Sequence, residues 1–364
     1  MTESVVAHIT RRNLLVGAGA VALGAATSRV QSQDPKPVGW AILGLGNYAT
    51  RNILPNLKHC KHTKLAAVIS GTPDKAKRIA GEYGLPESKI YSYDDMARIK
   101  DDPDIEVVYV ITPPGTHAGF SIRAAEAWKH VCCEKPMASD SAECRAMIEA
   151  CRKAGTRLQI GYRCHFEAHN LEAVRLCRSG ALGQIRTIRS EHGFTMNTDQ
   201  SWHSKRALGG IGAISEIGIY AIQAMCYLAG ADPVSVWGTR DKLDVPRFKE
   251  VEDVNHFNLF FPGGIQGIGS TAYSWNANNF RVLGSRGTLD AEPGTPYSGH
   301  RYRLNGQEMT IAPNNQWAEQ MDHFSECVRD PSKPLIASGE MGLRDILIME
   351  AILKSADEKR VVNL

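Results

Sequence analysis

The stretch VGWAILGLGNYATRNILPNL, residues 38–57, decides the fold of this chain. It has the pattern of an apolar strand, a glycine turn and a helix, and the turn from Gly44 to Ala49 matches G-x-G-x-x-G/A. Gly44 permits the tight turn, Gly46 lets the backbone approach a pyrophosphate, and Ala49 lets the helix pack closely on the strand. A tight turn that binds no ligand is the alternative. The predicted cofactor contacts of this turn are Gly44, Leu45, Gly46, Asn47 and Tyr48.

Strand and helix patterns alternate after this turn. Apolar strands are predicted at residues 64–70, 89–92, 106–112, 130–135 and 157–162, and helices at residues 74–84, 117–129 and 141–155. Such alternation is typical of a parallel, doubly wound sheet with helices on both faces. The sequence therefore predicts an α/β fold whose first domain, residues 38–160, is a Rossmann domain.

Length and composition limit the alternatives. A chain of 364 residues is long enough for two domains, and 43% hydrophobic and 22% charged residues are typical of a globular protein. The formal net charge of +3 is too small to indicate a nucleic-acid-binding protein. The nine cysteines lack any C-x-x-C pair and the histidines show no ligand spacing, so we expect free, buried thiols and no metal site.

The first 32 residues have the pattern of an export signal. Arg11 and Arg12 precede an apolar run from Leu14 to Ala26, and small residues follow it. The run is short for a transmembrane helix, and the paired arginines resemble a twin-arginine signal. We therefore expect recognition by the twin-arginine export machinery, a linker at residues 33–37 and a periplasmic protein, which an uncleaved signal would leave anchored to the membrane. A disordered start or a plain membrane anchor are the alternatives.

The end of the second predicted strand indicates which nicotinamide cofactor fits. A carboxylate at this position bonds the ribose 2′-hydroxyl of NAD, whereas this chain has Ser70, Gly71 and Thr72, followed by Lys75. Because no carboxylate stands here to repel a 2′-phosphate, and because cations follow nearby, the sequence favours NADP. The alternative is that the basic residues only coat an exposed helix. The predicted contacts are Ser70, Gly71 and Lys75.

A lysine follows the apolar part of the predicted strand at residues 130–135. It belongs to the motif Glu134-Lys135-Pro136, and ligands of open α/β sheets lie beyond the carboxyl ends of the strands. We therefore expect Lys135 near the reactive end of the cofactor, where a compact cation stabilises a deprotonated hydroxyl. A surface lysine at a strand end is the default alternative.

Other strand ends supply further candidates for cofactor binding. Thr112, Pro113 and His117 belong to TPPGTH, which follows the fourth strand, and they are expected at the edge of the cofactor. A helix-start residue facing solvent is an equal alternative for His117. Tyr93 is predicted to cover the adenine, and an ordinary packing tyrosine is nearly as good an account.

One polar pair stands in an otherwise apolar helix pattern. The stretch SEIGIY, residues 215–220, places Glu216 and Tyr220 four residues apart. Residues i and i+4 share one face of an α-helix, so both side chains are expected to point at the same target.

Taken in order, these motifs resemble the Gfo/Idh/MocA oxidoreductase family, and most of all its glucose–fructose oxidoreductase branch. The resemblance runs from about Val38 to the C-terminus and is carried by GLGNYA, GEYGLPESKIYSY, KHVCCEKPMA, IGYRCH, IGIY and NNQWAEQMDHFSECV. It implies a second α/β domain, residues 161–364, with a large open, mostly antiparallel sheet that faces a sugar and makes a homodimer or homotetramer. The later sequence agrees, because strand patterns occur at 185–194, 234–240, 257–261 and 265–274, and amphipathic helices at 316–328 and 340–356.

The resemblance also assigns roles. It implies that Tyr220 is the acid/base, assisted by the Lys135 cation, and that Glu216 hydrogen-bonds the sugar hydroxyl or orients the tyrosine. The implied substrate contacts are Lys135, Tyr162, His203, Glu216 and Tyr220. The expected nicotinamide pocket includes Glu134, Lys135, Tyr162, Arg163 and Trp202. The chain departs from the family at two positions, because relatives usually have aspartate in place of Glu216 and often arginine in place of His203.

Together these features predict an NADP-dependent sugar oxidoreductase. Free NADP(H) is not expected outside the cytoplasm, so an exported enzyme must keep its cofactor and re-oxidise it on site. This favours tightly bound NADP(H) and a ping-pong cycle, in which one aldose is oxidised at C1 to a lactone and a second sugar is then reduced. The alternatives are a sugar dehydrogenase or reductase with dissociable NADP(H), of the 1,5-anhydrofructose reductase kind, an exported NAD-dependent glycosidase, and a non-catalytic sugar or nucleotide sensor.

Overall fold

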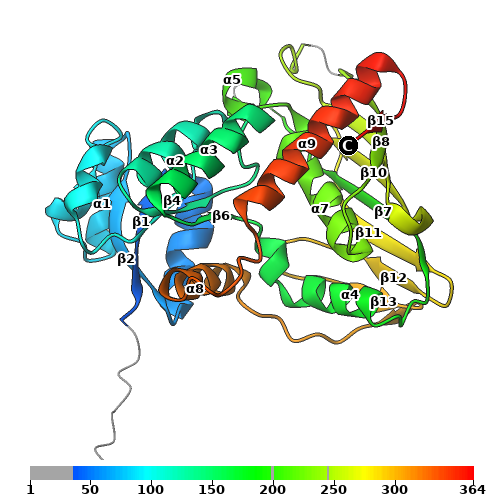
Figure 1. Ribbon diagram of the computed structural model, residues 1–364, viewed down its shortest axis with the longest axis horizontal. Coiled ribbons are helices and arrows are strands. Elements are labelled where there is room, and N and C mark those ends of the chain that lie inside the picture. Colours follow the sequence, from blue (N-terminus) through cyan, green and yellow to red (C-terminus); the bar gives the residue numbers. More distant parts are fainter. Residues whose placement is uncertain (1–35, 198–200, 244–245) are drawn as a thin grey trace, which may run out of the picture. The chain divides into compact units, whose positions relative to one another are not determined.

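The computed structural model describes residues 36–197, 201–243 and 246–364, which form two β-sheets with helices packed on them (Figure 1). The predicted signal at residues 1–32 lies outside the described residues, as does most of the predicted linker. Within the described ranges, no single helix is both long enough and apolar enough to cross a membrane. All nine cysteines are free and eight of them are buried, as expected.

The first sheet has six parallel strands in the order β3-β2-β1-β4-β5-β6. The strands are β1 (Val38–Leu43), β2 (Thr63–Ile69), β3 (Ile90–Tyr91), β4 (Val107–Val110), β5 (His130–Cys133) and β6 (Leu158–Ile160). All six residues of β1 are buried, because apolar side chains from helices cover both faces of the sheet. The connecting helices are α1 (Pro73–Glu82), α2 (His117–Glu126) and α3 (Ser141–Ala154). The predicted Rossmann architecture is confirmed.

The segment after the glycine turn differs from the regular helix that the sequence predicts. It contains a π-helical part, η1 (Ala49–Ile53), followed by a 3₁₀ part, η2 (Leu54–His59). Pro55 stands at the start of η2, and proline has no N–H for an intrahelical bond, so a uniform α-helix cannot run through it. Ile53 and Leu54 are nonetheless buried against the sheet, which the apolar spacing predicts.

The second sheet has nine strands in the order β14-β13-β12-β11-β7-β10-β9-β8-β15. Its strands are β7 (Ile185–Gly193), β8 (Ser235–Asp241), β9 (Val254–Phe260), β10 (Gln266–Ala272), β11 (Ala277–Gly284), β12 (Thr288–Ala291), β13 (Tyr302–Leu304), β14 (Gln307–Glu308) and β15 (Val362–Asn363). Only β7 and β10 pair in parallel among these strands, so the predicted mostly antiparallel sheet is confirmed. The strands from β11 onwards were not predicted, because they are short or carry polar residues on both faces.

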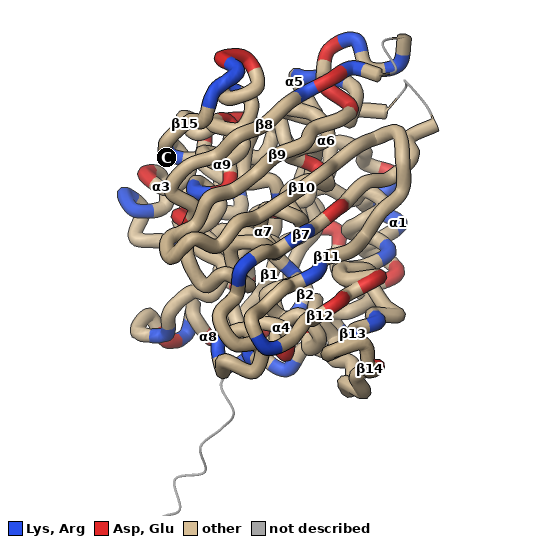
Figure 2. The backbone as a smooth tube through the Cα atoms, turned by 90° about the vertical axis from the view of Figure 1, so that its right-hand side faces the viewer, with Lys and Arg blue, Asp and Glu red and all other residues tan. Residues whose placement is uncertain are grey.

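Helices cover one face of the second sheet. They include α4 (Ala168–Arg178), α6 (Ala213–Glu216), α7 (Gly218–Ala229) and α9 (Gly339–Glu358), whereas α5 (Arg206–Gly209) contacts η5 (Pro114–Thr116) and η7 (Trp202–Ser204). In Figure 1, α4, α7 and α9 lie on the same side of the strands. Figure 2 looks onto the opposite face, where β7 to β12 lie in front of the helices.

One helix from the C-terminal part returns to the first sheet. Helix α8 (Gln316–Arg329) packs on β1 and β2, where Trp40 Nε1 donates a hydrogen bond of 2.9 Å to Ser325 Oγ. The Asp322 carboxylate accepts from the backbone N–H groups of Lys61 and His62. The start of α8 thereby lies beside the glycine turn, since Trp317 Nε1 donates to the hydroxyl of Tyr48 at 3.2 Å.

Candidate active site

Lys135 stands at the carboxyl end of β5 and contacts a helix from the second half of the chain. Its Nζ donates to the backbone oxygen of Glu216 at 2.8 Å and to Oε1 of the same residue at 3.1 Å. Both side chains are mostly buried, with 15% of Lys135 and 18% of Glu216 exposed. Burial opposes the ammonium charge, but Glu216 and the neighbouring acidic and phenolic groups raise the pKa of Lys135 above its usual value. Lys135 is therefore a cation held in place.

The helix that carries Glu216 is broken, which corrects the predicted continuous helix. Helix α6 ends at Glu216, Ile217 has φ −117° and ψ −33°, and α7 begins at Gly218. Tyr220 N donates to Ile217 O at 3.2 Å, whereas Glu216 O accepts from Lys135. The lysine therefore takes the carbonyl that the N–H of Tyr220 would use in a regular α-helix. Glu216 and Tyr220 meet at Lys135 because of this break, and not because they share one face of a helix.

The ring of Tyr220 lies between two cations. Lys135 Nζ is 5.3 Å and Arg163 Cζ is 5.1 Å from the ring centroid. His192 of β7 stacks on the same ring, with 5.7 Å between the centroids. Arg163, in η6 (Arg163–Phe166), is 4% exposed. Since a guanidinium stays protonated, Arg163 presents a permanent positive charge to the ring of Tyr220.

Arg163 is fixed by acceptors from a distant loop and from α8. Its guanidinium donates to the carbonyls of Thr295 and Pro296, at 2.6 and 3.1 Å, and to Gln316 Oε1 at 2.7 Å. Tyr297 lies over it, with 4.7 Å between Arg163 Cζ and the ring centroid. Tyr297, Gln316 and His192 were not predicted, because nothing in their local sequence distinguishes them from ordinary polar and aromatic residues.

Glu134 lies behind Lys135 and is buried. Tyr109 donates to its Oε1 at 2.6 Å, and the backbone N–H of Lys135 donates to its Oε2 at 3.2 Å. Burial raises the pKa of Glu134 to about 7, although Tyr109 and Lys135 act in the opposite direction. A side chain at Gly161 would collide with this carboxylate, since an added Cβ would stand 2.6 Å from Oε1. Glu134 is thus a packed carboxyl group that titrates near neutral pH.

His203 also approaches Glu216, and Trp202 stacks on His203. They lie in η7 (Trp202–Ser204), and their rings stack with 3.6 Å between centroids. His203 Nε2 is 3.9 Å from Glu216 Oε1. Burial lowers the pKa of His203, and the Glu216 carboxylate partly offsets this effect. The structure therefore brings His203, the predicted substrate contact, to the same carboxylate as Lys135.

The structure buries the side chains of both Tyr162 and His117. The Tyr162 side chain is 5% exposed, its hydroxyl has no hydrogen-bond partner among the described residues, and its ring packs 6.0 Å from that of His165, so the structure brings Arg163 but not this side chain to Tyr220. His117 is 1% exposed, and its ring nitrogens are each 2.8 Å from the carbonyls of Thr112 and Pro136. The alternative of a solvent-facing His117 is therefore wrong, because the ring is the link between two strand-end loops.

The glycine turn has the shape that a dinucleotide needs. Gly44 has φ +91°, and a Cβ there would stand 2.4 Å from the carbonyl oxygen of Ile111. A Cβ on Gly46 would meet nothing within 4 Å, so open space adjoins this backbone. Leu45 packs into the core and Asn47 is exposed, whereas the Tyr48 hydroxyl accepts from Trp317 Nε1 and the Tyr48 ring lies 6.1 Å from that of Tyr297, which covers Arg163. The turn and the Lys135 cluster are thereby joined through Tyr48.

The end of β2 fits the ribose end of such a cofactor. Ser70 is buried and its Oγ accepts from the backbone N–H of Thr72 at 3.1 Å, while Lys75 is exposed on α1. The ring of Tyr93 packs on Gly71, where an added Cβ would stand 2.8 Å from it. No carboxylate stands at residues 70–72.

Thr112 and Pro113 lie at the end of β4, where Thr116 donates to Thr112 Oγ1 at 2.7 Å.

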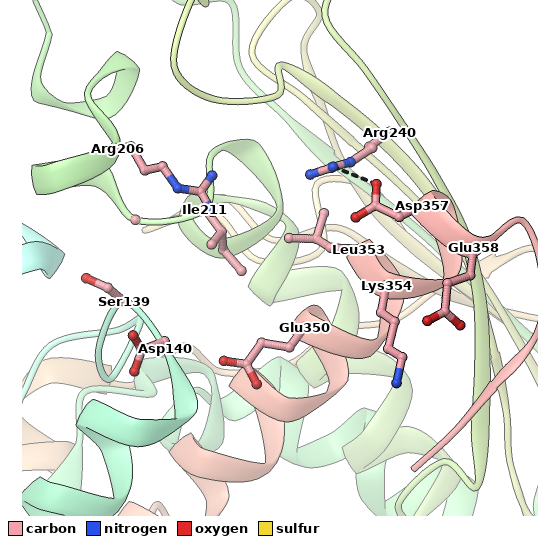
Figure 3. A pocket seen from close by; sticks show the side chains of 11 residues that line it. Ser139, Asp140, Arg206, Ile211, Arg240, Glu350, Leu353, Lys354, Asp357 and Glu358 are labelled. Atoms are coloured by element: carbon pink, nitrogen blue, oxygen red, sulfur yellow. Dashed lines mark hydrogen bonds and ion pairs between the residues drawn. The ribbon is translucent and has the colours of Figure 1, made fainter.

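A separate cavity of about 570 Å³ shares none of these residues (Figure 3). It is lined by opposite charges, including Arg206, Glu350 and Lys354, and Arg240 pairs with Asp357 at 2.6 Å across its rim. The chemistry that the sequence predicts therefore belongs to the Lys135–Glu216–Tyr220 cluster and not to this hollow.

Two family models match the chain. The model described as an oxidoreductase family with an NAD-binding Rossmann fold matches residues 38–162. The model of the GFO/IDH/MocA C-terminal domain matches residues 170–290. The first match includes the glycine turn and Lys135, and the second includes Glu216 and Tyr220.

Known proteins of similar sequence are oxidoreductases. An uncharacterized oxidoreductase from Rhizobium meliloti is 31% identical over 88% of this chain and 97% of its own length. The D-xylose 1-dehydrogenase [NADP(+)] of Haloarcula marismortui is 27% identical over 92% of this chain and 95% of its own length. The crystal structure of aldose–aldose oxidoreductase from Caulobacter crescentus, complexed with glycerol, is 47% identical. It covers 90% of this chain and all of that chain, with a TM-score of 0.87.

Proposed function

Because this chain belongs to the Gfo/Idh/MocA family of NAD(P)-dependent oxidoreductases, as its motifs predicted, we propose that it oxidises one sugar and reduces another with NADP(H) that stays bound. The donor is an aldose, oxidised at C1 to a lactone. The observation that carries the proposal is the contact of Lys135 with Glu216 beside Tyr220, at the strand end where a dinucleotide cofactor presents its reactive end. The likeness to an aldose–aldose oxidoreductase supports the choice of sugars.

The proton of the sugar hydroxyl is handled by Tyr220. The phenolate of Tyr220 takes this proton as a hydride leaves C1 and the C1 hydroxyl becomes a carbonyl, and the phenol so formed later returns the proton to the carbonyl oxygen of the second sugar. Lys135 and Arg163 stabilise the negative charge that develops on the phenol oxygen, since each lies within about 5.5 Å of the ring. Glu216 accepts a hydrogen bond from the sugar and holds Lys135. Bound NADP supplies the hydride acceptor and, when reduced, the hydride donor.

The cofactor is held by this chain's own residues. The backbone from Gly44 to Tyr48 fits the pyrophosphate, because the space beside Gly46 is open. Ser70 and Lys75 fit a 2′-phosphate, because β2 ends without a carboxylate that would repel it. These features support NADP over NAD.

Export and assembly complete the proposal. An enzyme sent to the periplasm by Arg11 and Arg12 has no supply of free NADP(H), so a cycle that regenerates bound cofactor suits it. The uncovered face of the second sheet supports a homodimer or homotetramer, because Trp237 and Ile268 are each 37% exposed there (Figure 2).

The test uses the mature protein purified without added cofactor. The expected spectrum shows bound nicotinamide, an aldose increases the near-ultraviolet absorbance of its reduced form, and a second sugar reverses the change. A spectrum without nicotinamide, or one that no sugar alters, would reject the retained-cofactor cycle.

A dehydrogenase that exchanges NADP(H) is the second candidate, favoured by the likeness to an NADP-dependent D-xylose 1-dehydrogenase. It would purify without cofactor and reduce added NADP⁺ in many turnovers with one sugar alone. The retained-cofactor enzyme would instead stop after one turnover without an acceptor sugar, so one progress curve separates the two.

A further inference from the structure

A second cluster of polar side chains forms at the start of α4. Glu167 is the N-cap of this helix, His169 lies in its first turn, and His300 comes from the loop before β13. His169 Nδ1 is 2.8 Å from Glu167 Oε1, and His300 Nε2 is 3.5 Å from Glu167 Oε2. The three ligating atoms all lie within 4.8 Å of one another. The two imidazole rings stack with 4.8 Å between centroids, so both present their edges to the same carboxylate.

The cluster is buried and lacks a permanent cation. The exposed fractions of the side chains are 2% for Glu167, 9% for His169 and 4% for His300. Among the described residues, histidines are the only ion-pair partners found for Glu167. Burial works against the Glu167 charge, but hydrogen bonds from His169 and Asn170 more than offset it and lower its pKa.

His300 has a buried nitrogen without a hydrogen bond. Its Nε2 has no hydrogen-bond partner among the described residues, although it faces the Glu167 carboxylate. Buried polar nitrogens are almost always satisfied, so an unpaired one directed at a carboxylate and a second imidazole needs an explanation. A cation between the three groups would satisfy this nitrogen and compensate the buried negative charge at once.

We propose that Glu167, His169 and His300 bind one divalent transition-metal ion, with zinc as the best fit. Two neutral imidazoles and a carboxylate are the donor set that zinc accepts, and water completes a fourth position. Tetrahedral bonds of about 2.0–2.1 Å separate neighbouring donors by roughly 3.3–3.4 Å. The observed separations of 2.8 and 3.5 Å join the two histidines to different oxygens of Glu167, and the ligating atoms, which lie within 4.8 Å of one another, would have to draw together when the ion binds.

The carboxylate is already oriented by neighbours, as metal-ligating groups usually are. Glu167 Oε2 accepts from both the backbone N–H and the side-chain amide of Asn170, each at 2.9 Å. Asn170 is in turn held by Tyr227, whose hydroxyl donates to Asn170 Oδ1 at 2.6 Å. These bonds leave Oε1 facing His169.

The ion would tie α4 to the loop that supports the active site. The segment that brings His300 also carries Thr295 and Pro296, whose carbonyls accept from Arg163, and Tyr297, which lies over the same guanidinium. Binding at His300 would therefore hold the loop that positions Arg163 against Tyr220. The role is structural, because the cluster is buried and Tyr220 is not among its members.

The test is metal binding by the full chain, purified without a histidine tag. Elemental analysis after dialysis is expected to give one zinc ion per chain. After chelator treatment, calorimetric titration with Zn²⁺ should show one site, and Co²⁺ should give the visible absorption of a tetrahedral complex. Thermal unfolding should shift to higher temperature with Zn²⁺. A wild-type protein that binds neither ion, or that binds only weakly at several sites, would overturn the proposal.

Variants separate this site from surface binding. His300→Gln and Glu167→Gln should each weaken Zn²⁺ binding by at least about tenfold, whereas His59→Gln, at an exposed histidine of η2, should leave it unchanged. Glu167→Gln keeps an oxygen for the cap hydrogen bond from Asn170, so it provides a folded variant where His300→Gln does not. X-ray absorption of the wild-type zinc protein should show nitrogen and oxygen neighbours only. Sulfur neighbours, or equal losses in all three variants, would assign the metal to other residues.

Discussion

Glu216 and Glu167 are both mostly buried carboxylates, but their charges are compensated in different ways. Glu216 has Lys135 at 3.1 Å, a cation that the chain itself supplies from β5. Glu167 has only His169 and His300 as ion-pair partners among the described residues. A buried charge must be paired with a counter-charge or neutralised, because the protein interior solvates it poorly. The first cluster is therefore complete for proton transfer, whereas the second calls for a cation from solution.

The largest expected effect is at the phenol of the first cluster. Tyr220→Phe removes the proposed proton carrier and should lower turnover by about 10²–10⁴-fold, as loss of a general acid–base group does. Folding stability and the zinc content of the second cluster should remain unchanged. Single-turnover absorbance of bound nicotinamide gives the rate, with Tyr83→Phe, at an exposed tyrosine, as the matched control. A variant that keeps its turnover would remove Tyr220 from the mechanism and favour a sugar sensor.

The next effect concerns Glu134, the carboxyl group packed behind Lys135. Burial raises its pKa to about 7 from an ordinary value of 4.5, so the folded protein binds more protons than the unfolded chain between these pH values. Its contribution to stability is therefore fully present below about pH 4.5 and is lost as pH rises to about 7, by on the order of 3 kcal/mol. Urea unfolding at pH 5 and pH 8 should show this loss in the wild type, and Glu134→Gln should abolish that part of it. Equal pH dependence in both proteins would show that the carboxyl group is already ionised.

Removal of the Lys135 cation should leave Glu216 without a permanent counter-charge among the described residues, as Glu167 is. Lys135→Met leaves Glu216 without its amine partner, which we expect to cost about 1–3 kcal/mol of unfolding free energy and most of the activity. The double variant Lys135→Met/Glu216→Gln should recover part of the stability but none of the activity. Urea denaturation measures the difference, with Lys58→Met on η2 as the exposed control. Additive losses in the double variant would mean that the two side chains do not interact.

The smallest expected effect tests how strongly activity depends on the position of the Glu216 carboxylate. Glu216→Asp withdraws the carboxylate from Lys135 by about one bond length, while the backbone carbonyl of residue 216 can still accept from the ammonium. We expect about a tenfold loss in kcat/KM, since small misplacements near the reacting groups are costly. Glu126→Asp, at the exposed last residue of α2, is the control. Unchanged or higher activity would show that the carboxylate acts on the sugar without any need for Lys135.

The sequence predicted much of the first sheet and the elements that carry the site. The glycine turn, the apolar strands and the strand-end motif around Lys135 are local patterns, because strand periodicity, turn sterics and chain direction place them without distant contacts. The same reasoning fails at Pro55, where a local backbone constraint replaced a regular helix with π and 3₁₀ turns. The strands β12 to β15 are too short to show a period.

Most of the site itself depended on contacts between distant segments. The break at Ile217 exists where Lys135, 81 positions away, takes the carbonyl of Glu216. The Tyr162 side chain is buried against His165, although its neighbour Arg163 faces Tyr220.

The sequence by itself therefore determined the family, the doubly wound first domain and the lysine at the end of β5. Only the tertiary structure decided which groups surround that lysine, and it alone gathered Glu167, His169 and His300, whose spacing along the chain has no metal-ligand pattern. The reason is that local periodicity and backbone sterics act over a few residues, whereas charge compensation in a buried site depends on whichever segments the packed core brings together.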